Sequence, residues 1–212
     1  MTYQQKRRVL STKSRTLLRF IVQVLTILFV IVDLLAFTTL HPADHRDATE
    51  LAVQVETNRE YDFIRTIVPY AQETQQKYGI LASLTLGQAA LESDFGRSGL
   101  AAKYHNLFGI KAYGDVPKVF LETKEFENNA WTTVREPFRV YEDWKQSVEG
   151  HAYLFTEGTT WNPNQYALVL AAQDYKEAAH AVQLSGYATD PAYTERLLEI
   201  IENYGLFEYD KI

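Results

Sequence analysis

Cysteine is absent from the 212 residues of this chain. Without it there are no disulfides, no thiolate nucleophile and no cysteine-based metal site. The five histidines, at positions 41, 45, 105, 151 and 180, lack metal-ligand spacing. Neither an HExxH sequence nor a glycine-rich phosphate loop occurs. The sequence therefore predicts a protein that works without a metal or another cofactor.

Basic residues are scarce outside the N-terminus. The chain has 21 Lys and Arg and 27 Asp and Glu, and six of the basic residues but only one acid lie in residues 1–40. The rest therefore carries 15 basic and 26 acidic residues, a net charge of −11. Nucleic-acid-binding surfaces need clustered Lys and Arg. We expect no nucleic-acid partner, and only local recognition of any anionic polymer.

Residues 20–40 form the longest apolar run, and their single charge is Asp33. At about 1.5 Å per residue they make about 32 Å of helix, enough to cross a bilayer. Lys and Arg cluster only on the N-terminal side, which places that end in the cytoplasm. We therefore expect a cytoplasmic basic tail over 1–16 and a transmembrane signal-anchor over 17–40, with the remaining chain outside the cell membrane.

A cleaved signal peptide, and hence a secreted protein, is the alternative, because a basic start and 13 uncharged residues also fit that class. No clear small-x-small cleavage site follows, since Ala36 and Ala43 each have a large residue two places before them. The uncleaved anchor is therefore favoured. Residues 41–58 are expected to form a polar linker, and residues 59–212 the functional domain.

Helical spacing of apolar residues dominates residues 59–212. It predicts helices over 59–79, 80–95, 100–103, 141–155, 164–172, 174–184 and 190–205. Residues 117–141 instead alternate in polarity around a turn at 127–130, which predicts a β-hairpin. Asp190 and Pro191 predict the N-cap and first position of the last helix. The predicted fold class is α+β, mainly helical with one inserted hairpin.

The helix predicted at 80–95 is apolar almost all round, yet it carries Glu92 near its end. Partial burial with no cation on the same helix is expected to raise the pKa of Glu92. Gln88, one turn earlier, is placed to hydrogen-bond this carboxyl. A carboxylic acid kept protonated near neutral pH suits a general acid that protonates a glycosidic oxygen. The alternative is a structural carboxylate paired with Arg97 or Lys103.

The segment LTLGQAALESDFGRSGLAAKYHNLFGIK, residues 84–111, resembles the catalytic segment of the family-73 glycoside hydrolases, which are bacterial peptidoglycan β-N-acetylglucosaminidases. The matching features are Gln88, the Glu92-Ser93-x-x-Gly96 turn and NLFGIK at 106–111. Residues 123–155 and GYATDPAYTERLLEIIENYGL at 186–206 resemble the hairpin region and the C-terminal signature of the same family. The matches follow the family's order and cover about residues 60–206.

The resemblance implies a lysozyme-like, two-lobed fold with a long cleft, and the glycan strands of peptidoglycan as substrate. The bond cut would be the β-1,4 bond between N-acetylglucosamine and N-acetylmuramic acid. Glu92 matches the catalytic acid, Glu125 a second functional carboxylate, and Tyr187 and Tyr193 match tyrosines of the cleft. The expected substrate-binding residues are Gln88, Asn106, Phe108, Tyr187 and Trp131, although Phe108 and Trp131 suit core packing equally well.

Two mechanisms stay open from sequence. Glu125 activates water as a base, although Glu122 and Glu127 are neighbours easily confused with it, or the substrate's own acetamido group attacks while Tyr193 positions it. The overall function also has alternatives. These are a muramidase or lytic transglycosylase of lysozyme-like fold, and a catalytically inactive, membrane-anchored wall-binding domain.

Overall fold

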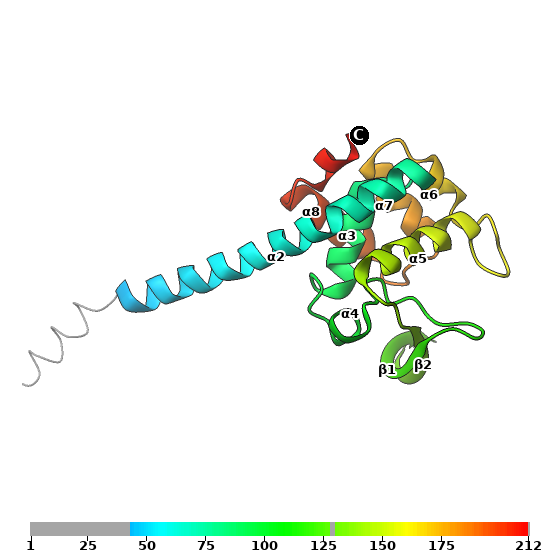
Figure 1. Ribbon diagram of the computed structural model, residues 1–212, viewed down its shortest axis with the longest axis horizontal. Coiled ribbons are helices and arrows are strands. Elements are labelled where there is room, and N and C mark those ends of the chain that lie inside the picture. The colour runs from blue at the N-terminus through cyan, green and yellow to red at the C-terminus, as the bar shows by residue number, and fades with distance from the viewer. Residues whose placement is uncertain (1–42, 128–129, 212) are drawn as a thin grey trace, which may run out of the picture. The chain divides into compact units, whose positions relative to one another are not determined.

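The computed structural model describes residues 43–127 and 130–211, and it is mainly helical (Figure 1). Its elements in chain order are α2 (Ala43–Tyr78), α3 (Ala82–Ser93), α4 (Gly99–Tyr104), β1 (Lys118–Glu127), β2 (Ala130–Arg139), α5 (Trp144–Glu157), α6 (Ala167–Ala171), α7 (Tyr175–Leu184), α8 (Tyr193–Asn203) and the 3-10 helix η1 (Leu206–Asp210). The chain divides into two compact units, residues 1–56 and 57–212. The candidate site lies wholly within the second.

Helix α2 begins earlier than the sequence predicts. The polar linker expected over 41–58 is helical from Ala43 onward. Residues 43–58 contain no Gly or Pro, and they include several good helix formers. Side chains of residues 48–55 are exposed. From Phe63 onward the apolar face of α2 is buried in the core, because helical spacing brings its members to one side.

Helix α3 runs through the core, with ten of its twelve residues buried. It has no N-cap side chain of its own. Instead Asp210 of η1 accepts hydrogen bonds from the backbone nitrogen and the Oγ of Ser83, both at 2.7 Å. Gln75 of α2 accepts one from the backbone nitrogen of Ala82 at 2.7 Å. Groups distant in sequence thus satisfy the free N–H groups of this helix end and fix its position.

The predicted hairpin is present. Strands β1 and β2 pair antiparallel in a continuous register from Lys118 opposite Arg139 to Glu127 opposite Ala130. Pro137 lies on β2, whose outer edge pairs with no further strand in the described sheet, so its missing N–H is tolerated. Its carbonyl accepts a hydrogen bond from the Ala112 nitrogen at 2.8 Å. The loop before β1 thereby fastens the base of the hairpin, which lies below the helices in Figure 1.

Helix α8 packs against α3 and begins at Tyr193. The prediction that Asp190 is its N-cap and Pro191 its first helical residue is wrong by two residues. Asp190 Oδ1 accepts a hydrogen bond from the Ala192 nitrogen at 2.9 Å. This contact, two residues ahead, closes a local turn that competes with helix formation. The turn delays the start of α8 and brings Tyr193 to its first position.

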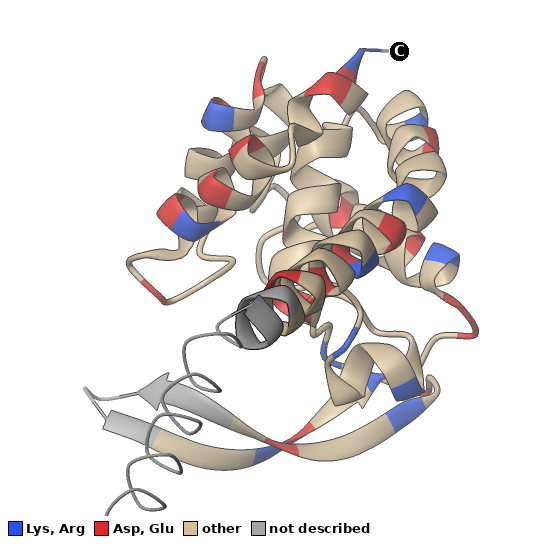
Figure 2. Cartoon of the chain, turned by 90° about the vertical axis from the view of Figure 1, so that its left-hand side faces the viewer, with Lys and Arg blue, Asp and Glu red and all other residues tan. Residues whose placement is uncertain are grey.

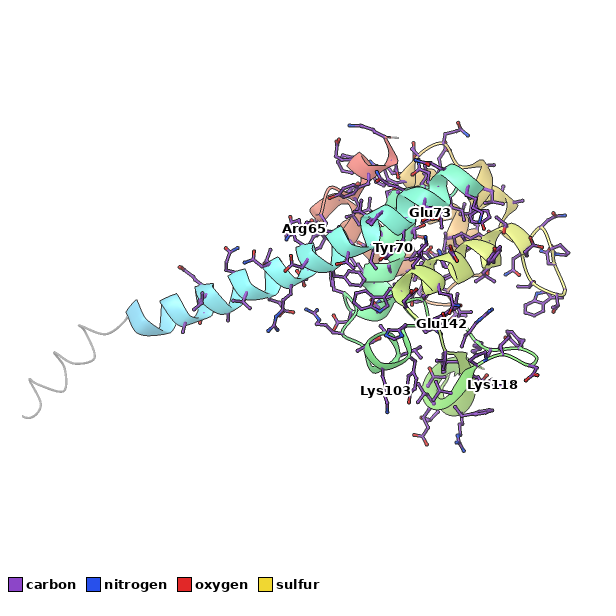
Figure 3. The ribbon with its side chains drawn as sticks, in the orientation of Figure 1. Arg65, Tyr70, Glu73, Lys103, Lys118 and Glu142 are labelled. Carbon is purple, nitrogen blue, oxygen red and sulfur yellow. The ribbon has the colours of Figure 1, made fainter. Side chains whose placement is uncertain are left out.

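Charged side chains lie mostly at the surface. Figure 2 shows Asp and Glu interspersed with Lys and Arg over the helices. Figure 3 places Glu73 on α2 and Lys103 on α4. The pair Lys145–Glu73, at 2.9 Å, is exposed to solvent and adds little to stability. No helix in the described part of the chain is long and apolar enough to cross a membrane. The transmembrane segment predicted at 17–40 lies outside the described residues.

Candidate active site

Glu92 lies in the last turn of α3, just before a tight reversal of the chain. The two residues preceding Gly96 adopt φ angles of 53° and 50°, and Gly96 itself has a φ of 79°. A β-carbon at Gly96 would lie 2.9 Å from aromatic ring atoms of α2 and α5, so both backbone and packing require glycine there. Ser93 Oγ accepts the Gly96 N–H at 2.7 Å. The Glu92-Ser93-x-x-Gly96 pattern is therefore the turn that ends α3.

The Glu92 carboxyl is open to solvent on one side and surrounded by protein on the other. Desolvation raises its pKa, and this effect is opposed by a hydrogen bond from Tyr193 and by the positive charge of Arg196. Tyr193 Oη donates to Glu92 Oε1 at 2.7 Å. Oε2 accepts no hydrogen bond from any described residue. A carboxyl with a raised pKa and one accessible oxygen can deliver a proton to a bound ligand.

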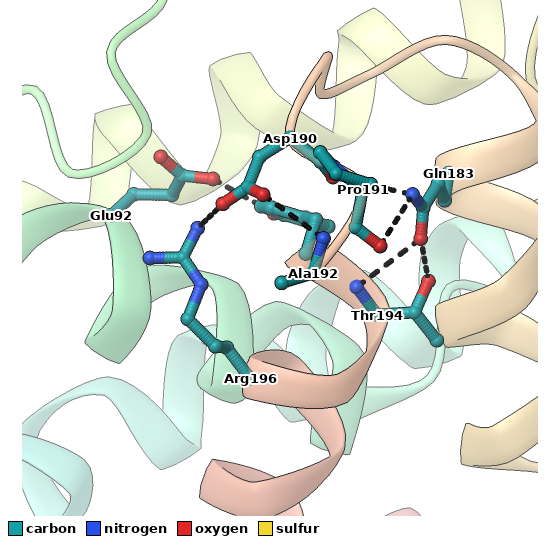
Figure 4. Close-up of polar contacts among 8 residues, drawn as sticks. Glu92, Gln183, Asp190, Pro191, Ala192, Thr194 and Arg196 are labelled. Atoms are coloured by element: carbon teal, nitrogen blue, oxygen red, sulfur yellow. Dashed lines mark hydrogen bonds and ion pairs between the residues drawn. The ribbon is translucent and has the colours of Figure 1, made fainter.

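Glu92 does not form an ion pair with Arg97, the cation of the turn that follows α3. Arg97 instead forms an ion pair with Asp94 at 2.7 Å and lies 3.8 Å from Glu60. The cation that influences Glu92 is Arg196 of α8, about a hundred residues away along the chain. Arg196 in turn is ion-paired with Asp190 (Figure 4). Its charge is therefore partly balanced, which leaves desolvation as the dominant influence on Glu92.

Behind Glu92 lies a buried polar chain. Tyr193 is 3% exposed, and its oxygen accepts a hydrogen bond from Gln88 Nε2 at 2.9 Å. Gln88 is fully buried, and its Oε1 lies 3.1 Å from His151 Nε2. Gln88 thus reaches Glu92 only through Tyr193. The expectation that Gln88 hydrogen-bonds the carboxyl directly is wrong, because its amide turns inward from α3 towards α5 and α8.

Three of the expected substrate-binding residues are buried, and this corrects the sequence prediction. Gln88 has both amide atoms engaged inside the protein. Asn106 is 1% exposed, and its side chain bonds the backbone of Ile110 and Arg139, which holds the NLFGI loop to the hairpin base. Phe108 is 4% exposed and stacks on His151. These side chains support the site from within and do not line it.

The remaining predicted residues fall into two groups. Tyr187 is partly buried, and its ring lies 6.0 Å from that of Tyr193, while its hydroxyl is buried with no hydrogen-bond partner among the described residues. Burial raises its pKa, so it is a neutral phenol. Glu125 lies on β1 opposite Thr132, and Trp131 lies on β2. The side chains of Glu125 and Trp131 are outside the described part of the structure.

His151, Arg196 and Asp190 also contribute to this site, and the sequence does not single them out. His151 has no metal-ligand spacing, and Arg196 lies on a helix whose pattern indicates only amphipathic packing. The GYATDPAY segment was itself a signal, because Tyr193 lies in it and Arg196 is three residues further along the same helix. Among the described residues no group of His, Asp and Glu side chains is placed to hold a metal ion.

A helical domain with one hairpin and, at the end of α3, a carboxyl of raised pKa that is open to solvent is typical of the lysozyme-like class of glycan-cleaving domains. The family model for Glucosaminidase, described as "Mannosyl-glycoprotein endo-beta-N-acetylglucosaminidase", matches residues 68–206. The chain belongs to this family.

Known relatives agree with this assignment. Exo-glucosaminidase LytG of Bacillus subtilis is 44% identical over 172 residues, which are 78% of this chain and 61% of that protein. A "Probable N-acetylmuramidase" of Lactococcus lactis is 37% identical over 164 residues, 76% of this chain and 37% of that protein. The catalytic domain of the Listeria monocytogenes autolysin Auto superposes with a TM-score of 0.65 at 34% identity, covering 71% of this chain and 87% of that one. This chain thus spans less than two thirds of the length of each of the two sequence relatives.

Proposed function

We propose that this protein hydrolyses the β-1,4 bond between N-acetylglucosamine and N-acetylmuramic acid in peptidoglycan, and so remodels the cell wall. The observation that carries the proposal is Glu92, a solvent-accessible carboxyl whose pKa desolvation raises. Membership of the Glucosaminidase family and 44% identity to an exo-glucosaminidase support the choice of bond.

Glu92 acts as the general acid in this proposal. Tyr193 donates to Oε1, so the carboxylic proton lies on Oε2, which accepts no hydrogen bond from a described residue. From there it is delivered to the glycosidic oxygen as the bond breaks, and the leaving sugar departs as a neutral alcohol. A raised pKa increases the fraction of Glu92 that is protonated at a given pH, and so the fraction able to donate its proton as the oxygen gains charge.

For the second role we propose Glu125 on β1, as the carboxylate that activates water. Glu125 belongs to the hairpin, an element separate from α3, and the family resemblance supports it as the second carboxylate. The rival is attack by the substrate's acetamido group, with Tyr193 holding it. The hydroxyl hydrogen of Tyr193 is already directed at Glu92, and this favours Glu125. A Glu125→Gln variant that keeps wild-type turnover would favour the acetamido route.

A second candidate is cleavage of the other glycosidic bond, as in a muramidase. The 37% identity to a protein printed as a probable N-acetylmuramidase is the specific observation in its favour. The two candidates share the same acid chemistry and differ only in which sugar becomes the new reducing end. Product analysis therefore separates them, whereas loss of activity in Glu92 variants does not.

The decisive experiment is digestion of purified peptidoglycan by the full-length chain in detergent, with products reduced by borohydride and identified by mass spectrometry. We expect reduced N-acetylglucosamine ends from wild type. Glu92→Gln should lower the rate by at least about a hundredfold, since it removes the general acid. Glu122→Gln, on the same hairpin as Glu125, is the matched control and should keep full activity.

Other outcomes have distinct meanings. Reduced N-acetylmuramic acid ends would assign a muramidase, and anhydro ends a lytic transglycosylase. Absence of products from wild type under conditions where LytG is active would contradict an enzyme and favour the wall-binding alternative. Products released one sugar at a time from chain ends would indicate an exo-enzyme, as the name of LytG states for that relative.

We further propose that residues 17–40 anchor the protein in the cell membrane, with the catalytic domain on the outer side. The apolar run at 20–40 and the basic residues before it support this proposal. After fractionation, the protein should sediment with membranes and resist alkaline carbonate extraction, with Met1 at its N-terminus. Recovery of a shortened protein from the culture medium alone would contradict the anchor and support signal cleavage.

A further inference from the structure

Four polar side chains form a continuous hydrogen-bonded chain from the core to the Glu92 carboxyl. His151 Nε2 lies 3.1 Å from Gln88 Oε1, Gln88 Nε2 donates to Tyr193 Oη at 2.9 Å, and Tyr193 Oη donates to Glu92 Oε1 at 2.7 Å. His151 and Gln88 are fully buried, and Tyr193 is 3% exposed. Water therefore cannot replace a partner in the first two links, and each polar atom depends on its neighbour in the chain.

His151 is held rigidly at the inner end of this chain. Its ring stacks on Phe108 with centroids 4.0 Å apart and planes at 14°. The centroid of the Phe155 ring lies 4.4 Å from that of His151. Burial lowers its pKa to about 3, so the imidazole is neutral and carries one N–H. Nδ1 has no hydrogen-bond partner among the described residues. A buried N–H left unpaired is costlier than an unpaired lone pair, so the proton lies on Nε2 and is donated to Gln88.

The proton on His151 Nε2 decides the direction of every later bond. An amide has one donor end and one acceptor end. When Gln88 Oε1 accepts from His151, its NH₂ group must face Tyr193. The tyrosine oxygen then accepts from Gln88, and its single hydrogen is left for Glu92 Oε1. The carboxylic proton of Glu92 is consequently confined to Oε2, on the accessible side.

We propose that His151 is a positioning residue of the active site, which orients Gln88 and through it Tyr193, so that the acid proton of Glu92 is held on Oε2. This role rests on the proposed function only in that Glu92 acts as the acid, and it is independent of which glycosidic bond is cut. His151 touches neither Glu92 nor the solvent-accessible side of the site.

Loss of the His151 donor has a specific consequence. With Phe at position 151, an unrotated Gln88 would leave Oε1 buried and unpaired. Rotation of the amide by half a turn pairs Oε1 with Tyr193 but leaves the buried N–H groups of Gln88 without an acceptor, so neither orientation satisfies both ends of the amide once His151 is lost. Gln88 is then no longer held in one orientation, and in the rotated form Tyr193 divides its one hydrogen between Gln88 and Glu92. The ionised form of Glu92 loses part of its stabilisation, and its pKa rises further.

The test is a titration of Glu92 itself, which needs no substrate. Full-length protein in detergent is labelled with ¹³C at the glutamate carboxyl, and the Glu92 resonance is the one lost in Glu92→Gln. We expect His151→Phe to raise the titration midpoint, by less than Tyr193→Phe raises it, because only the rotated form of Gln88 draws the tyrosine hydrogen away from Glu92. His151→Gln, whose amide nitrogen replaces Nε2 as a donor, should keep the wild-type midpoint.

A double variant provides the sharpest control. Gln88→Met removes the competing acceptor, so adding it to His151→Phe should return the midpoint towards the wild-type value. If His151→Phe acted only by disturbing the core, the double variant should move the midpoint further from the wild-type value, because it changes two core residues. Tyr193, Tyr187 and Arg196 all influence Glu92 or are influenced by it, and Asp190 holds Arg196. All four are unchanged in these variants, so a shift of the midpoint reports on the hydrogen-bonded chain from His151 to Glu92.

The outcomes that overturn the proposal are equally specific. An unchanged midpoint in His151→Phe, or a further rise in the double variant, would contradict it. So would ¹⁵N NMR of the wild type showing the His151 proton on Nδ1, a measurement that holds even if the variants fail to fold. The wild type could be inactive on peptidoglycan and still show the expected titrations. That result would contradict the proposed function but support the positioning role of His151.

Discussion

At the scale of the residue, Glu92 shows how environment defines a chemical role. Many other Asp and Glu side chains of the described residues lie on the surface. Glu92 differs because desolvation outweighs the opposing influence of Tyr193 and Arg196. Arg196 therefore limits the rise in pKa, as a smaller influence than the Tyr193 hydrogen bond.

Arg196→Met tests this balance. Removing the cation takes away an influence that lowers the Glu92 pKa and leaves Asp190 unneutralised nearby, and both changes raise that pKa. Since the acid must be protonated to act, activity falls as pH rises through its pKa, so the alkaline limb of the kcat/KM profile should move to higher pH. Arg65→Met, which breaks the exposed pair with Asp62 on α2, is the control. An alkaline limb that moves to lower pH would contradict the assignment.

At the scale of the element, the site depends on how closely α8 approaches α3. Glu92 belongs to α3 and Tyr193 to α8, and the two helices meet at Gly87. A β-carbon there would lie 2.8 Å from Ile201 Cγ1 and 3.0 Å from Leu197 Cδ1, and both of these side chains are fully buried. Because the core is close-packed, the helices would have to separate to admit even one methyl group.

Gly87→Ala should therefore disturb both stability and catalysis. Overpacking offsets the better helix propensity of Ala, and we expect a net loss of about 1–2 kcal/mol and a Tm lower by about 2–6 °C. Catalysis should fall further, since Tyr193 moves away from Glu92. Gly99→Ala is the matched control, because Gly99 begins α4 with no atom within 4 Å of its β-carbon position. A Gly87→Ala protein as stable as Gly99→Ala would contradict the close approach.

The positions of the helices and the hairpin could be predicted from the sequence. Apolar spacing located α3, α5, α7, α8 and the hairpin, since each buries one face and follows its own period. It failed where a distant group decides a boundary. The cap of α3 comes from Asp210 and Gln75, and the start of α8 is delayed by the Asp190 turn. The spacing of apolar residues carries no information about either contact.

At the scale of the whole molecule, burying a histidine makes folding depend on pH. The pKa of His151 is about 3 in the folded protein, against 6.5 ordinarily. Between these values the unfolded chain binds a proton that the folded protein does not. Stability is therefore full above about pH 6.5, and it falls as pH drops towards 3.

The wild type should lose about 1.4 kcal/mol of unfolding free energy per pH unit from this group across that window. His151→Gln has no titrating group there, so the difference between the two proteins should widen by that amount as pH is lowered. Denaturant unfolding between pH 7 and pH 4 measures it. Carboxyl groups common to both proteins cancel in the comparison. A constant difference across this range would mean that His151 is solvated in the folded state.

The sequence by itself determined the helical class, the hairpin and the family, because these rest on local patterns: apolar periods and motifs in order. It also predicted Glu92 as the acid, from an isolated carboxyl on an apolar helix. Only the tertiary structure decided how that carboxyl is held. Tyr193, Arg196 and His151 come to Glu92 from helices 50 to 100 or so residues away along the chain. It also turned Gln88, Asn106 and Phe108 inward, since side-chain direction on a helix or loop depends on which neighbours pack against it.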